Sequence, residues 1–124
     1  MIQRIITFMR KPFKKHLNAI DIESAHGGSG RRQLLLSKND FISSQMEAMT
    51  KGFLAPKGVF DWHAHKDVDE FFLVTKGIGL IQFEDGTEMN YAKDDLIYIP
   101  SNIKHRIENT GEEESEFFFV RLNS

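Results

Sequence analysis

The sequence predicts one all-β domain, a sandwich or barrel of short antiparallel strands, on three observations. Short apolar runs recur along the chain and are separated by turn residues such as Lys76-Gly77 and Asp85-Gly86. Between the turns, apolar and polar residues alternate with the period of two that is typical of a β-strand. The 124 residues include no cysteine, and a domain of this length buries roughly two-thirds of its unfolded surface without disulfides.

The first 44 residues are predicted to hold peripheral strands and a flexible loop. Residues 1–10 and Leu34–Leu36 are candidate strands. Residues 26–32, His-Gly-Gly-Ser-Gly-Arg-Arg, predict a mobile basic loop, since they lack the spaced glycines and final Lys-Ser/Thr of a phosphate-binding loop. The alternative role for this segment is a lid whose arginines meet an anionic substrate. Residues 37–40 predict a turn or the cap of one helical turn.

The core of the domain is expected over about residues 45–122. Residues 45–54 predict a strand that leads toward Pro56 and Gly58. Asp85-Gly86 lies between two apolar runs and predicts a two-residue hairpin, because Asp-Gly readily adopts the positive φ angles of such a turn. Asn109-Thr110-Gly111 marks a further turn.

Two predicted strands are apolar on both faces. Phe71 and Leu73 lie opposite Phe72 and Val74, and residues 117–120 read Phe-Phe-Phe-Val. A strand with two apolar faces is usually covered on both. In a chain this short, we expect a second sheet to cover the inner face and a partner subunit to cover the outer one. The sequence therefore predicts a homodimer.

Charge and hydropathy restrict the partners of the chain. Sixteen basic and eighteen acidic residues give a net charge of −2, so we expect no nucleic acid partner, and no window has the roughly eighteen apolar residues that span a membrane. The basic start before Asp21 is not a secretory signal, because the apolar run of Ile5-Ile6 is too short. A transit peptide is the alternative to an exposed basic edge, although Pro12 would interrupt its helix. The lack of cysteine fits a cytoplasmic protein.

Four side chains suggest a metal site. His63 and His65 are two residues apart and point to one face of a strand, and Glu70 begins the next predicted strand. His105 lies in the alternating segment 103–108. A single histidine on an apolar face is more often a core residue, but these positions can converge. Imidazoles with one carboxylate suit a divalent transition metal ion, namely iron, manganese, nickel, zinc or cobalt.

The stretch from Gly58 to Asn109 resembles the cupin superfamily. The first cupin motif appears as Gly58, His63-Ala64-His65, Glu70 and Gly77. The second motif, Pro-x-Gly-x-x-His-x-x-x-Asn, appears as residues 100–109, with His105 at the histidine and Asn109 at its end.

This resemblance has three departures, and none affects a ligand position. Gly58 is one residue nearer to the histidines than usual, and Asp94 and Asn102 replace two glycines. Asp and Asn are the residues that best tolerate the turn conformations of glycine. The resemblance implies a double-stranded β-helix, or jelly-roll, barrel over residues 1–124, often dimeric. It also implies one metal ion, held by His63, His65, Glu70 and His105.

The residues expected near the ligands bear on the substrate. Most are apolar, which favours an apolar or aromatic small molecule in the barrel, although they could equally fill a narrow core. They are Phe60, Phe72, Ile103, Ile107 and either Phe83 or Phe119. Glu47, Lys51 and Tyr98 are candidate acids or bases, whereas Arg106 should point away from the cavity.

A fold does not identify a reaction. The favoured hypothesis is a mononuclear metal enzyme of the dioxygenase type, because a redox-active ion with open positions can bind substrate and oxygen together. Two alternatives stay open. One is a non-catalytic, metal-anchored protein that binds or senses a small molecule, and the other is an enzyme similar to a sugar isomerase.

Overall fold

The computed structural model describes residues 10–25 and 28–124. The candidate strand at residues 1–10 therefore lies almost entirely outside the described residues. Within them the model has ten strands and two short 3-10 helices: η1 (Leu17–Ala19), β1 (Ile22–Ala25), β2 (Gly30–Ser37), η2 (Lys38–Asp40), β3 (Met46–Leu54), β4 (Val59–His63), β5 (Val68–Lys76), β6 (Ile78–Phe83), β7 (Glu88–Ala92), β8 (Leu96–Ile99), β9 (His105–Asn109) and β10 (Ser115–Asn123). No helix in this described part is long and apolar enough to cross a membrane.

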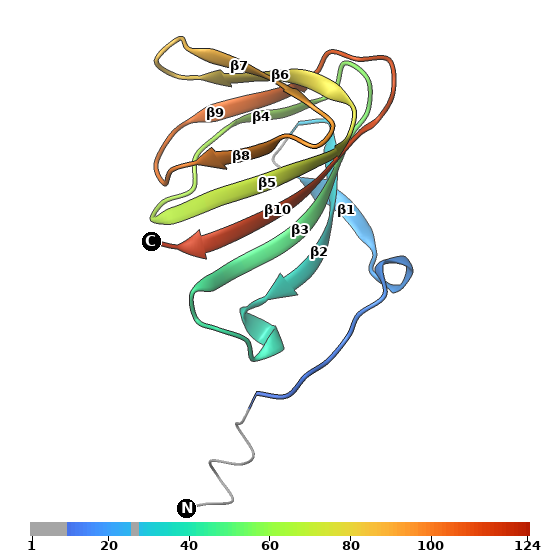
Figure 1. The fold of residues 1–124 in the computed structure, drawn as a ribbon, viewed down its shortest axis with the longest axis vertical. Coiled ribbons are helices and arrows are strands. Elements are labelled where there is room, and N and C mark those ends of the chain that lie inside the picture. Colours follow the sequence, from blue (N-terminus) through green and yellow to red (C-terminus); the bar gives the residue numbers. More distant parts are fainter. Residues whose placement is uncertain (1–9, 26–27) are drawn as a thin grey trace, which may run out of the picture.

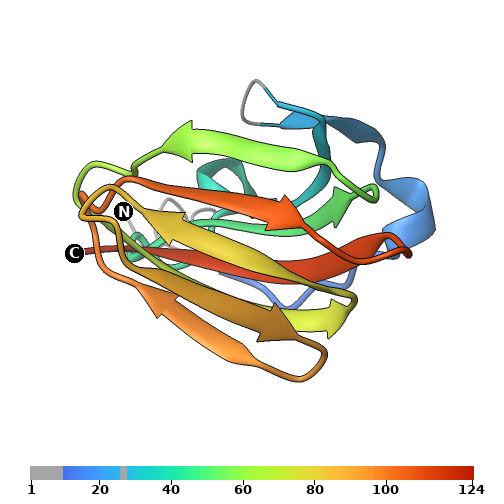
Figure 2. The ribbon, with the colours of Figure 1, turned by 90° about the horizontal axis from the view of Figure 1, so that it is seen from above.

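The strands form two antiparallel sheets that face each other (Figures 1 and 2). One sheet has six strands in the order β1-β2-β3-β10-β5-β8, and the other has four in the order β4-β9-β6-β7. From β3 onward the chain changes sheet at every connection except the β6–β7 hairpin. This alternation builds the double-stranded β-helix, and the predicted all-β class and jelly-roll barrel are confirmed.

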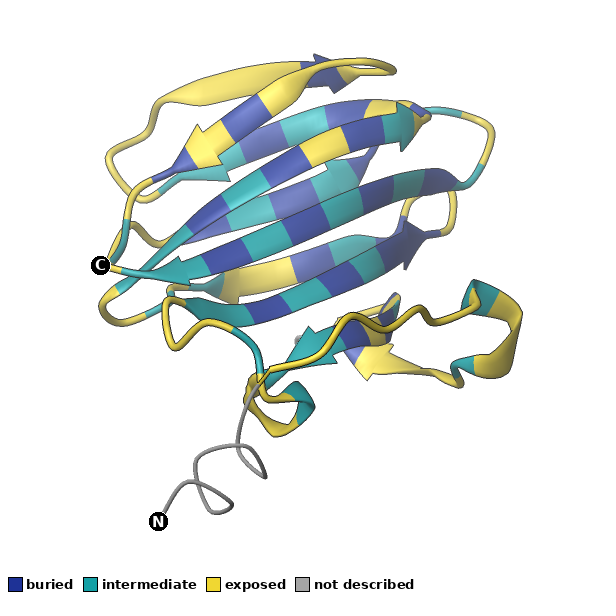
Figure 3. Cartoon of the chain, turned by 60° about the horizontal axis from the view of Figure 1, so that its bottom comes forward, coloured by how far each residue is buried: buried dark blue, intermediate teal, exposed yellow. Residues whose placement is uncertain are grey.

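The inner faces of the two sheets pack against each other to form the core. Buried residues alternate with more exposed ones along the strands, as the period of two predicts (Figure 3). Aromatic rings occupy the centre, where Phe117 lies 6.0 Å from Phe60, 6.0 Å from Phe72 and 5.5 Å from Phe119 between ring centroids. Each fully buried ring of this kind contributes about 1.5–3 kcal/mol.

Positive φ angles occur where the sequence departs from the cupin pattern. Asp94 has a φ of 75° and Asn102 a φ of 67°, so both residues adopt the left-handed conformation of the glycines they replace. The β6–β7 hairpin differs from the prediction. Its loop has three residues, because Phe83 and Thr87 still pair and Gly86, with a φ of 90°, follows a turn that begins at Phe83.

The predicted loop over residues 26–32 was too long, because β2 begins at Gly30. Arg31 and Arg32 pair with both β1 and β3. Their side chains also form ion pairs across the molecule, Arg31 with Glu114 and Arg32 with Glu23, each at 2.9 Å. Ladder hydrogen bonds and cross-strand charges thus hold these residues in a strand and leave no mobile lid there; residues 26 and 27 lie outside the described part.

The short helix η2 follows the prediction for residues 37–40. Ser37 caps it, and the Asp40 side chain accepts a hydrogen bond from the Ser37 backbone N–H at 2.9 Å. The Lys15 ammonium also contacts Asp40 at 2.8 Å and donates to the Leu35 carbonyl. The N-terminal segment is thereby fastened to the edge of the six-stranded sheet.

The outer face of the six-stranded sheet is apolar over β10, β5 and the edge strand β8. We define the outer apolar face as Phe71, Leu73, Leu96, Tyr98, Phe118 and Val120. Cross-strand pairing makes these residues contiguous, with Phe71 opposite Tyr98 and Val120, and Leu73 opposite Leu96 and Phe118. Three of them are strongly exposed in the single chain: Leu73 (42%), Tyr98 (51%) and Leu96 (73%).

Candidate metal site

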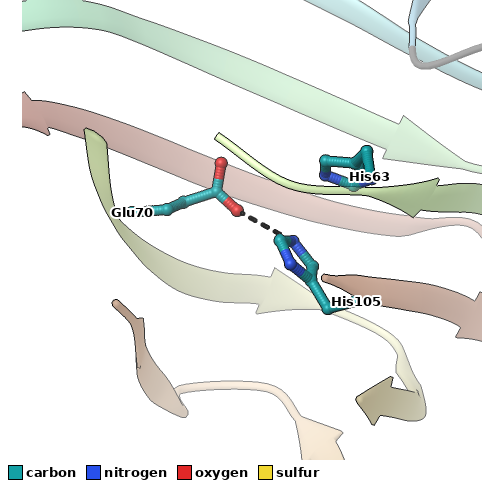
Figure 4. Close-up of side chains that lie close together, drawn as sticks. All are labelled: His63, Glu70 and His105. Carbon is teal, nitrogen blue, oxygen red and sulfur yellow. Dashed lines mark ion pairs between the residues drawn. The ribbon is translucent and has the colours of Figure 1, made fainter. Parts of the chain in front are cut away.

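Three of the four predicted ligands converge from three different strands (Figure 4). His63 is the last residue of β4, His105 is the first residue of β9, and Glu70 lies in β5. The pairing of β4 with β9 sets His63 directly opposite His105, and β5 of the other sheet supplies the carboxylate. One donor atom from each residue lies within 4.8 Å of the others. This spacing is compatible with a single metal ion.

Main-chain carbonyls fix the orientation of two imidazoles. His63 Nδ1 lies 2.6 Å from the Asp61 carbonyl oxygen, and His105 Nδ1 lies 2.8 Å from the Ile103 carbonyl oxygen. A carbonyl can only accept, so in each neutral ring Nδ1 carries the hydrogen and Nε2 keeps its lone pair. In metal sites, the histidine nitrogen that does not bind the metal commonly donates such a hydrogen bond.

Glu70 is buried, and its two oxygens have different surroundings. Oε2 accepts a hydrogen bond from Arg121 Nε at 2.9 Å. Oε1 lies 3.5 Å from His105 Nε2, and neither of these two buried atoms forms a hydrogen bond within the described residues. Buried polar atoms without a partner are rare in proteins. A cation between this oxygen and this nitrogen would satisfy both, so the residues present fit a metal ion.

The fourth predicted ligand, His65, lies at the edge of this group. It follows β4, and its Nε2 is 3.2 Å from Glu70 Oε2. Its ring centroid is 5.2 Å from that of His63 but 6.4 Å from that of His105. His65 does not belong to the group whose donor atoms all lie within 4.8 Å of one another. Its side chain is 21% exposed, so it marks the open side of the site.

Two side chains are held in the protonation state that a metal ion needs. Burial lowers the pKa of His63 to about 4, so the ring is neutral at pH 7. Burial alone would raise the pKa of Glu70. The contacts with His105 and His65 and the charge of Arg121 outweigh that effect and hold the pKa of this carboxyl well below its usual range. Both groups therefore present lone pairs at neutral pH.

A pocket of about 510 Å³ opens beside His65. We call it the His65 pocket and define it by six polar lining residues: Arg32, Ser37, Glu47, His65, Lys66 and Arg121. Four apolar side chains complete its wall. Of the candidate acids and bases, Glu47 does line this pocket, and it forms an ion pair with Lys38 at 2.9 Å.

The apolar residues expected around the ligands belong to the core instead. Phe60, Phe72, Ile107 and Phe119 are at most 5% exposed and do not line the His65 pocket. They fill the barrel, which was the alternative interpretation of these residues. Phe83 does lie beside the site, with its ring centroid 6.5 Å from that of His105.

Ile103 lies beside the site, with its carbonyl oxygen 2.8 Å from His105 Nδ1, whereas two other candidates lie away from it. Ile103 precedes β9 and is 38% exposed. Lys51 forms an ion pair with Glu116 at 3.0 Å, and Tyr98 is an exposed residue that packs against the Phe71 ring at 5.0 Å. Neither contacts the ligands.

The position of Arg106 was predicted from the sequence, whereas the role of Arg121 was not. Arg106 points away from the site, as predicted, and donates hydrogen bonds to Gln82 and Glu108. Arg121, by contrast, is the buried partner of Glu70. The signal that could have identified it is its phase in β10, where it shares the inward face of Phe117 and Phe119.

Comparisons with known proteins agree with this architecture. The family model of the cupin domain matches residues 53–121. An uncharacterized protein of Bacillus subtilis, YdbB, is 41% identical over 49 residues, and this alignment covers 40% of the chain and only 43% of that relative.

Solved structures match over most of the chain. The structure of a predicted oxalate decarboxylase from Thermotoga maritima has 23% identity and a TM-score of 0.77, covering 90% of this chain and all of that one. The polyketide cyclase RemF from Streptomyces resistomycificus has 16% identity and a TM-score of 0.75, covering 90% of this chain and 80% of that one. At these identities the likeness shows the fold alone.

Proposed function

The chain belongs to the cupin domain family, and we propose that it is a mononuclear metal enzyme of the dioxygenase type that acts on a small molecule. We propose His63, His65, Glu70 and His105 as the ligands. The observation that carries this proposal is the group of two imidazoles and one carboxylate, with Glu70 and His105 buried and His63 partly buried, whose donor atoms lie within 4.8 Å of one another.

The chemistry of the donor set supports an oxygen-using centre. Two histidines and one carboxylate on one side of an ion form the facial arrangement that non-haem iron oxygenases use. When bound, a redox-active ion would supply the electron transfer that dioxygen chemistry needs. His65 would be a fourth donor on the open side. Iron, manganese, nickel, cobalt and zinc all accept these ligand types.

The residues around the ligands have positioning roles in this proposal. The carbonyls behind His63 and His105 leave the lone pair of each ring on Nε2, which would bind the ion, and Arg121 donates to Oε2 of Glu70, so that Oε1 would be the carboxylate donor. The packed aromatic core would exclude water from the inner side of a bound ion. Substrate would enter from the other side, through the His65 pocket.

A non-catalytic protein that binds or senses a small molecule is the second candidate. The observation that favours it is the lack of an unpaired carboxylate among the described residues that line the His65 pocket. Glu47 is the only carboxylate among the pocket residues, and it is already paired with Lys38. The same observation disfavours an isomerase that would use a carboxylate to transfer protons.

Metal content is the first measurement. Elemental mass spectrometry of the protein purified from its own host should give near-stoichiometric iron, manganese or nickel. Oxygen uptake should then be measured with a panel of small substrates. The His105→Ala variant should lose the ion and keep its fold, because the apolar core does not depend on the ion. His16→Ala, at an exposed histidine outside the site, is the matched control and should retain the metal.

Each outcome separates the candidates. Metal together with oxygen uptake would support the dioxygenase. Metal without oxygen chemistry, combined with tight binding of one compound, would favour the binding protein. Retention of full metal by the His105→Ala variant would refute the ligand assignment.

We also propose that a second copy of the chain covers the outer apolar face. Phe71, Leu73 and Phe118 form its centre, and large exposed apolar patches of this kind mark interaction surfaces. Light scattering should give twice the monomer mass of 14.3 kDa, and Leu73→Glu should dissociate the dimer. A monomeric parent protein would refute this interface.

A further inference from the structure

We infer that the site takes a small carboxylate anion, whose negative charge is recognised by Arg32 and Lys66 at the wall of the His65 pocket. This inference rests on the proposed metal site and names the class of its substrate. It replaces the apolar or aromatic molecule that the sequence favoured.

The first support is the charge of the ligand set. Arg121 and Glu70 form a buried ion pair at 2.9 Å, with side chains 7% and 2% exposed. The arginine thus cancels the charge of the only carboxylate ligand, and the remaining ligands are imidazoles. A divalent ion held there keeps its two positive charges in a largely buried site, and an uncompensated buried charge is costly. An anionic ligand at the open coordination positions would offset that charge.

The second support is the charge of the pocket wall. Three cationic side chains line the His65 pocket, Arg32, Lys66 and Arg121, against one carboxylate, Glu47. The Lys38 ammonium at 2.9 Å neutralises that carboxylate. Glu70 already balances Arg121 and Glu23 balances Arg32, so the excess positive charge of the pocket before any ion is bound is the one charge of Lys66.

Two of these cationic side chains have nitrogen atoms that can bind an anionic ligand. Lys66 forms no ion pair with any other residue that the structure describes. Arg32 uses Nε for Glu23, so its two terminal nitrogens remain for a further acceptor among the described contacts. A guanidinium fork and an ammonium are the groups that proteins use to bind carboxylates. A neutral diol would leave Lys66 without a charged partner and the two terminal nitrogens of Arg32 without an acceptor among the described residues.

The third support is size. A volume of about 510 Å³ suits a small molecule, and six of the ten lining residues are polar. A compound with one carboxylate at the ion and a second at Arg32 and Lys66 would use both features. A short dicarboxylate is therefore the simplest probe.

The test uses the full-length protein loaded with zinc, malonate as the probe, and malonamide as its neutral isostere. Zinc affinity is measured first by competition with a chelator, and ligand binding follows by isothermal titration calorimetry. We expect malonate to bind the zinc-loaded protein and to bind the metal-free protein at least tenfold more weakly. Malonamide should bind at least tenfold more weakly than malonate, because it lacks the charge.

Substitutions then locate the anion. Lys66→Met and Arg32→Met should each weaken malonate binding about tenfold, the loss of one charge-assisted hydrogen bond, and leave zinc affinity within about twofold. Lys93→Met removes a lysine that does not line the His65 pocket and should change neither affinity. Circular dichroism checks that each variant is folded, and Lys66 is exposed, so its replacement leaves the core intact.

The outcomes distinguish this inference from the function on which it rests. A protein that does not bind zinc would overturn the proposed metal site and this inference with it. If the protein binds zinc but binds malonate no more tightly than malonamide, the inferred carboxylate substrate is wrong, while the proposed metal site stands. Malonate binding that is unaffected by both Lys66→Met and Arg32→Met would also overturn it, because the anion would then lie elsewhere.

Discussion

Replacing Arg121 by methionine tests the charge balance at the centre of the site. The substitution keeps most of the side-chain volume and removes the cation 2.9 Å from Glu70. Both side chains are almost fully buried, so in the metal-free protein the carboxylate would lose its charged partner and remain without water. Removing one partner of a buried ion pair costs about 3–5 kcal/mol.

The cost converts into a large shift of the unfolding temperature. A chain of 124 residues unfolds with an entropy of about 0.26 kcal/mol per kelvin, from about 2.1 cal/mol per kelvin for each residue. A loss of 3 kcal/mol therefore lowers Tm by about 12 °C. With zinc bound, the ion would compensate the carboxylate, and only a hydrogen bond of about 1.5 kcal/mol is lost, which lowers Tm by about 6 °C.

The same thermodynamic cycle fixes the change in metal affinity. If the metal-free protein loses about 1.5 kcal/mol more than the loaded protein, the variant must bind zinc about tenfold more tightly than the parent does. Thermal unfolding by circular dichroism, in chelator and in excess zinc, measures both losses. Arg106→Met is the control, because its ion pair with Glu108 is partly exposed and contributes about 0–1 kcal/mol.

Two results would refute this reasoning. Equal losses of Tm with and without zinc would mean that no ion compensates Glu70. A metal-free Arg121→Met protein as stable as the parent would mean that the carboxylate does not depend on the arginine.

Three further predictions concern other parts of the barrel. Glu70→Gln removes the only anionic ligand and should lower divalent metal affinity by orders of magnitude, measured by calorimetry; unchanged affinity would exclude the carboxylate as a ligand. The metal-free protein should lose stability as the pH falls from about 6.5 to about 4, because His63 takes up a proton in the unfolded chain over this range but stays neutral in the folded one. Urea unfolding of the parent and of His63→Phe tests this, and an equally steep loss in the variant would contradict it. Asn109→Ala should destabilise the protein by about 3 kcal/mol, since the buried amide makes three side-chain hydrogen bonds at 2.8 Å, each with a net contribution of about 1 kcal/mol. Its zinc affinity should stay unchanged, because Asn109 lies at the other end of β9 from His105.

The sequence predicted well whatever depends on neighbours along the chain. Alternation within β5 and β9 identified the faces of Glu70 and His105, and short turn motifs identified most strand ends. The left-handed turns at Asp94 and Asn102 followed from the glycines that the cupin motif has at these positions, together with the tolerance of Asp and Asn for that conformation. These features are local, so periodicity and turn chemistry were sufficient to predict them.

Features that depend on depth or on distant pairing were not predicted. Period two assigns a face to a side chain but not its depth in the barrel, so Phe60 and Phe119 were expected near the ligands although they lie in the core. The role of Arg121 depends on the register of β10 against β5, which sets it opposite Glu70 across a separation of 51 residues. Arg32 was expected in a loop because glycines precede it, but pairing with β3 overrides that local preference.

The origin of the ligands in both sheets has a mechanical consequence. His63 and His105 belong to the four-stranded sheet and Glu70 to the six-stranded one. An ion bound to these three residues would cross-link the two sheets at one end of the barrel. Removing it would loosen that end, while the aromatic core around Phe117 holds the layers together elsewhere. After loss of the metal, hydrogen exchange of the backbone amides should be faster in the strand ends near the site and little changed in the middle of the barrel.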